Sequence, residues 1–116
     1  MMMTTLEKAI KVAKLVDNKK GIDVRVLHIG TLTTIGDYFV VATGTATTQV
    51  KSYADEVEEK MSQAGFEPKR IEGYNTANWI LMDYDDVIVH LFLKETREFY
   101  ALERLWGDAP EIEWDK

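Results

Sequence analysis

The chain has 116 residues and a formal net charge of -6. A chain of this length forms one domain and buries about 65% of the surface that it exposes when unfolded. It contains no cysteine, which excludes disulfide bonds and thiolate metal sites. Only His28 and His90 could supply imidazole ligands, and their separation matches no familiar ligand spacing. We therefore expect no metal and no other cofactor.

Charge is distributed unevenly along the chain. Residues 1–30 hold six Lys or Arg against three acidic residues, whereas residues 31–116 hold eight against seventeen. An acidic body argues against direct, sequence-specific binding of nucleic acid, which requires a basic surface. It suits a basic protein partner, although the acidic residues near positions 55–59 could simply solvate a helix.

Targeting signals are not evident. No apolar run approaches the roughly 20 residues that a membrane-spanning helix needs. The opening residues, MMMTTLEKAI, lack both the layout of a secretory signal and the Arg-rich composition of an organellar transit peptide. We expect a cytoplasmic protein that contacts no membrane.

The first half of the chain predicts a helix followed by two strands. The helix begins after Thr4 or Thr5 as its cap and ends at Gly21. Strands are expected at residues 23–29 and 38–43, joined by a Thr-rich loop, and the second strand is apolar enough to be buried on both faces. The core-facing positions of the helix are Leu6, Ala9, Ile10, Ala13 and Val16.

A second helix and a short strand follow. Gly44 and Thr45 turn the chain into the helix, which is capped near Thr45 or Thr47 and ends at Gly65. Residues 66–72 predict a strand that starts after Pro68, because proline interrupts strand pairing. The core-facing positions of this helix are Val50, Tyr53, Ala54, Val57, Met61 and Ala64.

The segment WILMDYDDVIVHLFLKETREFYALERLW, residues 79–106, predicts a β-hairpin followed by a helix. The hairpin strands are residues 79–83 and 86–93, with a two-residue turn at Tyr84 and Asp85. Alternation divides their side chains between two faces. The aliphatic face, expected to be core, carries Ile80, Met82, Val87, Val89 and Leu91. The opposite face, here called the Trp79 face, carries Trp79, Leu81, Asp83, Asp86, Ile88, His90 and Phe92.

Pairing across the Trp79 face suggests a partner. The predicted turn sets Trp79 opposite His90, Leu81 opposite Ile88, and Asp83 opposite Asp86. Like charges directly opposite on a sheet are unfavourable by up to roughly 1 kcal/mol. A cationic partner docking on this face would explain the two carboxylates.

The last helix carries Phe99, Leu102 and Trp106 on one side and is terminated by Gly107 and Pro110. The elements together predict an α/β fold, with one domain over residues 1–110 and an acidic C-terminal tail over residues 111–116. A mixed, roughly five-stranded sheet with helices packed mainly on one side is the simplest arrangement. The Trp79 face would then lack a cover, unless Ile112 and Trp114 of the tail or a second copy of the chain supplied one.

Three segments resemble the ribosomal silencing factors, also called Iojap-like proteins. They are GDYFVVATGTATTQVKSYADEVEEKM (36–61), EGYNTANWILMDYDDVIVHLF (72–92) and REFYALERLWGDAP (97–110). The resemblance implies binding to ribosomal protein fourteen on the joining face of the large ribosomal subunit. The resemblance also implies that the bound protein would keep the small subunit away and repress translation without catalysis. The family commonly has Gly in place of Asp85, where we expect the turn to require a positive φ.

The resemblance and the hairpin geometry select partner-binding residues: Trp79, Leu81, Asp83, Asp86, Ile88, His90 and Tyr100. Trp79 and Leu81 would be apolar anchors, and Asp83 and Asp86 would meet Lys or Arg. His90 could equally be satisfied by a neighbour. Tyr100 could serve helix packing instead, and Arg97 and Glu103 could either extend the surface or form structural ion pairs.

Two other functions remain open. The element order resembles the nucleotidyltransferase fold, as do the silencing factors themselves, and active members of that fold carry a metal-binding D-x-D pair on the strand after the second helix. Residues 69–72 offer no such pair, and Asp83 and Asp85 have this spacing only at a hairpin tip, so we expect no enzyme. The other alternative is a dimeric adaptor without a ribosomal role, in which the Trp79 face serves only a homodimer.

Overall fold

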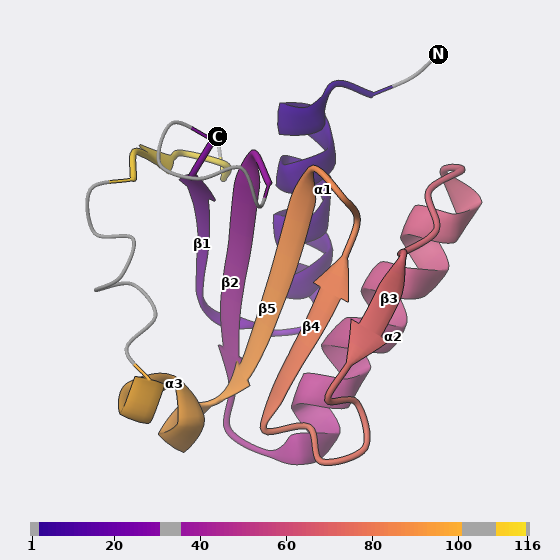
Figure 1. Ribbon diagram of the computed structural model, residues 1–116. Helices are drawn as coiled ribbons and strands as arrows, with labels where there is room; N and C mark the ends of the chain where they lie inside the picture. The colour runs from indigo at the N-terminus through magenta and orange to yellow at the C-terminus, as the bar shows by residue number, and fades with distance from the viewer. Residues whose placement is uncertain (1–2, 31–35, 101–108, 116) are drawn as a thin grey trace.

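The computed structural model describes residues 3–30, 36–100 and 109–115, with residues 98–100 described by their backbone only. The helices and strands are α1 (Thr5–Asn18), β1 (Ile22–His28), β2 (Tyr38–Gly44), α2 (Thr47–Gln63), β3 (Arg70–Glu72), β4 (Trp79–Asp83), β5 (Val87–Leu93), α3 (Lys94–Tyr100) and β6 (Glu111–Ile112). Figure 1 shows the strands side by side in one twisted sheet, in the order β3-β4-β5-β2-β1-β6. The predicted single α/β domain is confirmed, with six strands in the described residues where the sequence suggested about five.

The sheet is mixed, as expected. β2 pairs with β5 in parallel, and the other four strand pairs are antiparallel. The chain between β2 and β5 runs through α2, β3 and β4, and α2 supplies the crossover that returns it to the same end of the sheet. β2 and β5 lie at the centre, where both faces are covered, so their sequences are almost continuously apolar.

The two long helices begin in different ways. Thr4 caps α1 in a reciprocal capping box, in which its Oγ1 accepts from the Glu7 backbone N–H and the Glu7 carboxylate accepts from the Thr4 N–H. At α2 the N-cap is Ala46, which has no side-chain cap. There the Gln49 side chain accepts both the backbone N–H and the hydroxyl of Thr45 at 2.8 Å. Thr4 was one of the two predicted caps of α1, whereas the α2 start depends on a glutamine that the sequence analysis did not single out.

The aliphatic face of the hairpin forms the core beneath α1 and α2, which lie together behind the sheet in Figure 1. Every residue assigned to that face is fully buried, as predicted: Ile80, Met82, Val87, Val89 and Leu91. α3 lies beside β5 and β2, and its Arg97 donates to the hydroxyl of Thr43, which alternation places on the Trp79 side. Of the three helices in the described residues, α1 and α2 therefore share one side of the sheet.

Ile112 and Trp114 of the C-terminal tail do not cover the Trp79 face. β6 adds to the β1 edge, where Ile112 lies opposite Val26. Both Ile112 and Trp114 pack against the core on the α1 and α2 side, and the Trp114 indole donates to the Val24 carbonyl at 3.0 Å. The alternation of β6 turns these side chains toward the helices, so the predicted tail cover of the Trp79 face is wrong. The division of the chain at residue 110 stays a prediction.

The Trp79 face is also less open than expected. Its centre is buried, with exposed fractions of 5% at Ile88, 4% at His90 and 0% at Phe92. Only the β4 side of the face keeps partly exposed side chains, at Trp79, Leu81 and Asp83. The expectation of a wholly uncovered face is therefore wrong, and the accessible part is a strip along β4.

The hairpin register differs from the prediction by two residues. Trp79 lies opposite Phe92, Leu81 opposite His90, and Asp83 opposite Ile88. The Tyr84 N–H donates to the Val87 carbonyl at 3.0 Å, so the turn contains Asp85 and Asp86. Asp85 has a φ of 75°, which confirms the positive φ expected there. A shift of two residues preserves the alternation, so the two faces keep their members except at the turn.

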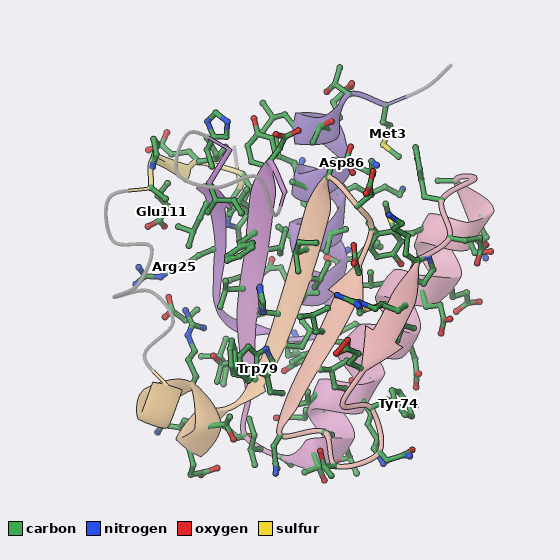
Figure 2. All side chains as sticks on the ribbon, in the orientation of Figure 1. Met3, Arg25, Tyr74, Trp79, Asp86 and Glu111 are labelled. Atoms are coloured by element: carbon green, nitrogen blue, oxygen red, sulfur yellow. The ribbon has the colours of Figure 1, made fainter. Side chains whose placement is uncertain are left out.

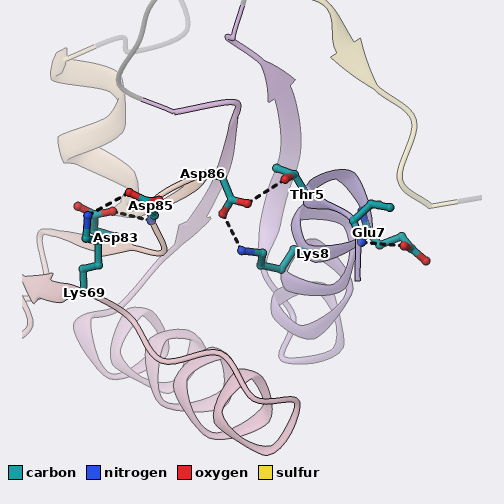
Figure 3. A network of polar contacts seen from close by, with 8 residues as sticks. Thr5, Glu7, Lys8, Lys69, Asp83, Asp85 and Asp86 are labelled. Carbon is teal, nitrogen blue, oxygen red and sulfur yellow. Dashed lines mark hydrogen bonds and ion pairs between the residues drawn. The ribbon is translucent and has the colours of Figure 1, made fainter. Parts of the chain in front are cut away.

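Asp86 is the residue that the corrected register moves. It does not face Asp83, and it does not belong to the Trp79 face. Its carboxylate turns toward α1 and accepts from the Lys8 ammonium at 2.6 Å and the Thr5 hydroxyl at 2.8 Å (Figure 3). Lys8 also lies over the Phe66 ring, 4.8 Å from its centroid. Burial raises the pKa of Asp86, but the bonds from Lys8 and Thr5 outweigh it and hold that pKa below its usual value.

Lys8→Met tests whether this pair fastens the turn to α1. The variant leaves a half-buried carboxylate without its cation, so the free energy of unfolding should fall by about 2 kcal/mol and the pKa of Asp86 should rise. Urea unfolding and a carboxyl NMR titration measure the two effects. The matched control is Lys14→Met at an exposed position of α1, which should change stability by less than about 0.5 kcal/mol. Equal losses in the two variants would contradict the role of Lys8.

Candidate partner-binding surface

Trp79 begins β4 and is held by two aromatic neighbours. Its ring stacks on Phe92, with centroids 5.0 Å apart and an interplanar angle of 30°. Its indole Nε1–H donates to His90 Nδ1 at 3.1 Å. Figure 2 shows Trp79 on the side of the sheet away from α1 and α2. A large ring that is both partly exposed and held in place suits an interface anchor, because little side-chain entropy remains to be lost on binding.

Leu81 continues the accessible strip one pleat further along β4. It packs, with Trp79, against a second hydrophobic cluster on this side of the sheet. The buried members of that cluster are Leu27, Ile29, Phe39, Val41, Ile88 and Phe92. Ile88, which we predicted as a partner-binding residue, therefore lies beneath the surface and supports it from below.

His90 is buried among rings. Phe39 meets it edge-on with centroids 4.5 Å apart, and Trp79 lies at 5.9 Å. Because Nδ1 accepts the indole N–H, the proton of the neutral imidazole is on Nε2. Within the described part of the chain Nε2 has no hydrogen-bond partner. Burial lowers the pKa of His90 to about 4, so the ring is neutral at physiological pH.

The carboxylates at the hairpin tip are paired with basic residues at the start of the edge strand β3 and directly before it. Asp83 accepts from the Asp85 backbone N–H at 2.8 Å and lies 3.5 Å from the Arg70 guanidinium. Asp85 pairs with Lys69 at 3.0 Å, and both side chains are exposed (Figure 3). Among the described residues no group of three or more His, Asp or Glu could hold a metal ion. The bond from the Asp85 N–H to the Asp83 carboxylate makes both residues part of the turn.

The remaining residues considered for partner binding lie away from the β4 strip or have side chains outside the described residues. Asp86 is bound to α1, as described above, and the side chains of Tyr100 and Glu103 lie outside the described residues. Arg97 has a structural role: it is 7% exposed, pairs with the Asp23 carboxylate at 3.1 Å and donates to the Asp23 carbonyl at 3.0 Å. Lys8 was missed because it is not among the core-facing positions that helical spacing predicted, and its burial beside Ala9 and Val12 appears only in the structure.

A comparison of the sequence with protein families matches residues 2–116 to the model of the family described as ribosomal silencing factor during starvation. The chain belongs to the ribosomal silencing factor family. A curated ribosomal silencing factor from Halalkalibacterium halodurans is 43% identical over 84% of each chain. The chloroplastic protein Iojap of Zea mays is 34% identical over 93% of this chain and 47% of its own length.

The solved structures agree with this assignment. A crystal structure of a Chromobacterium violaceum protein matches with a TM-score of 0.88 and 34% identity, covering 90% of this chain and 88% of the other. Family membership makes this a non-enzymatic factor that regulates translation. Among the described residues no helix is long and apolar enough to span a membrane.

The buried, neutral His90 predicts a pH-dependent stability. The unfolded chain takes up a proton near the ordinary histidine value of 6.5, whereas folded His90 resists protonation until about pH 4. The unfolded state therefore binds more protons in this window, and the free energy of unfolding should fall as the pH is lowered through it.

His90→Phe isolates that contribution, because all other titratable groups are retained. Between pH 7.5 and pH 5 the wild type should lose roughly 2 kcal/mol more than the variant, measured by urea unfolding. Identical pH profiles for the two proteins would mean that His90 is not the buried, neutral residue described here.

Proposed function

We propose that this protein binds the large ribosomal subunit through ribosomal protein fourteen and sterically blocks association of the small subunit. The observation that carries the proposal is the strip of Trp79, Leu81 and Asp83 along β4. It combines a fixed aromatic ring, an aliphatic side chain and a carboxylate on one accessible strip of the sheet face. These are the components of an interface with an apolar anchor and a charged rim.

The apolar part of the strip supplies affinity. Anchors that fill a partner's pocket carry most of the energy of typical interfaces, and tryptophan is strongly enriched among them. Phe92 and His90 already hold the Trp79 ring, so docking would cost little further order. Leu81 extends the same apolar surface without a charge that would have to be desolvated.

The charged part selects a basic partner. Among the described residues, Asp83 and Asp85 pair with Arg70 and Lys69, whose side chains are 64% and 65% exposed. Such surface pairs contribute little and exchange readily with competing cations. A Lys or Arg of a ribosomal protein, desolvated by the interface, would form the stronger pair. The formal net charge of -6 favours the same encounter.

The shape of the molecule suits a steric block. It measures 35 × 33 × 28 Å, with α1 and α2 on the side of the sheet opposite the strip. If the strip faces the large subunit, the helical layer stands between the two subunits. No catalytic step is needed, because an object of this thickness keeps the two surfaces apart.

A cytoplasmic location and a homodimer belong to the same proposal. The family includes proteins named as chloroplastic, so the compartment follows from the host and not from the fold. In a homodimer that uses another surface, each copy would keep its β4 strip available for the ribosome. An adaptor that uses the strip for self-association would instead hide it.

Substitution of the strip should abolish ribosome binding. Trp79→Ala should weaken binding to purified large subunits by about 2 kcal/mol or more, or roughly thirtyfold, and Asp83→Lys should also reduce it by placing a cation against a basic partner. Co-sedimentation at moderate salt measures both. The matched control is Glu59→Lys, the same kind of charge reversal at an exposed position of α2, which should bind like the wild type.

Sedimentation velocity of Trp79→Ala separates the two functions. The ribosomal function predicts the oligomeric state of the wild type together with lost subunit binding. The adaptor function predicts a different pair of results. Trp79→Ala would dissociate into monomers, and the wild type would not bind large subunits.

A further inference from the structure

A histidine, His90, lies at the buried centre of the Trp79 face, where an apolar side chain would be expected. His90 lies opposite Leu81 of β4 and Val41 of β2, and it is 4% exposed. Its ring neighbours are Phe39, Trp79 and Phe92. A phenylalanine would fill such an apolar site without leaving the Nε2–H unpaired, which costs free energy in a buried position. The histidine must therefore provide something that a phenylalanine cannot.

What it provides is an acceptor. Its Nδ1 lies 3.1 Å from the Trp79 indole nitrogen, and this bond determines the tautomer of His90. The bond also constrains the rotation of the indole about its side-chain torsions, because a hydrogen bond is directional in the plane of the ring, whereas stacking on Phe92 is not. The acceptor atom of His90 therefore contributes to the position of Trp79.

We infer that His90 is a positioning residue for the partner anchor: it occupies the Trp79 indole N–H, so that Trp79 meets its partner through ring carbons only. This inference rests on the proposed function. It names the chemistry of the partner surface that covers Trp79. That surface carries aliphatic groups or a Lys or Arg cation over the ring, and no acceptor directed at the indole nitrogen.

The alternative contact is disfavoured by the same geometry. A partner carbonyl or carboxylate could capture the indole N–H only by breaking the bond to His90. That would leave both ring nitrogens of a buried imidazole unpaired, since Nε2 has no partner among the described residues. A partner acceptor at this place would therefore gain one hydrogen bond but leave Nδ1 of His90 without its donor.

Two variants separate the acceptor from the shape of the ring. His90→Phe keeps a flat apolar ring and removes the acceptor, whereas His90→Asn places an amide oxygen near the former Nδ1 position. In protein labelled with ¹⁵N-tryptophan, the Trp79 indole resonance is assigned by its absence in Trp79→Phe. The wild type should show His90 as the Nε2–H tautomer and a slowly exchanging Trp79 indole N–H. Exchange should accelerate about fivefold or more in His90→Phe and recover in His90→Asn.

Binding to purified large subunits gives the second readout. His90→Phe should weaken it about fivefold, and His90→Asn should restore most of the loss. In the wild-type complex the Trp79 indole N–H should stay bonded to His90 and protected from exchange. The inference is overturned by an Nδ1–H tautomer, by full binding in His90→Phe, or by an indole N–H that leaves His90 on binding. If the wild type does not bind subunits at all, the proposed function fails, while the tautomer and exchange data still decide whether His90 positions Trp79.

Discussion

The closure of the β4–β5 hairpin at Asp85 and Asp86 is the constraint on which the rest of the structure depends. A positive φ at Asp85 lets the chain reverse between Tyr84 and Val87, and this sets Trp79 opposite Phe92. The same turn directs the Asp86 carboxylate to Lys8 of α1. One local backbone conformation thereby determines both the register of the functional strand and its attachment to the helical layer.

The register then decides what the surface can do. It stacks Trp79 on Phe92 and brings His90 within hydrogen-bond distance of the indole, so the partly exposed anchor rests on buried rings. Asp83 remains at the rim, where the exposed Arg70 of β3 balances its charge. The accessible surface is a narrow strip along β4 because the neighbouring β5 and β2 positions are buried. Binding chemistry and fold stability therefore share the same side chains.

Sequence patterning predicted the fold and the faces well, because alternation and helical spacing are local signals. It could not choose between hairpin registers two residues apart, since both keep the aliphatic and aromatic sets on separate faces. The choice depends on the turn conformation at Asp85 and on the long-range bond from Lys8 to Asp86, which no local pattern encodes. β6 was missed for a related reason: two residues carry no periodicity, and Ile112 and Trp114 fit either side of a sheet until pairing with β1 selects one.

The central claim is that the β4 strip faces ribosomal protein fourteen, and site-specific photo-cross-linking tests it most directly. A photoreactive phenylalanine analogue placed at Leu81, which is partly exposed in the middle of the strip, should cross-link to ribosomal protein fourteen in purified large subunits. The same analogue at Glu59 on α2 should give no such product, because α2 lies on the other side of the sheet. A cross-link to this protein from Glu59 and none from Leu81 would contradict the account.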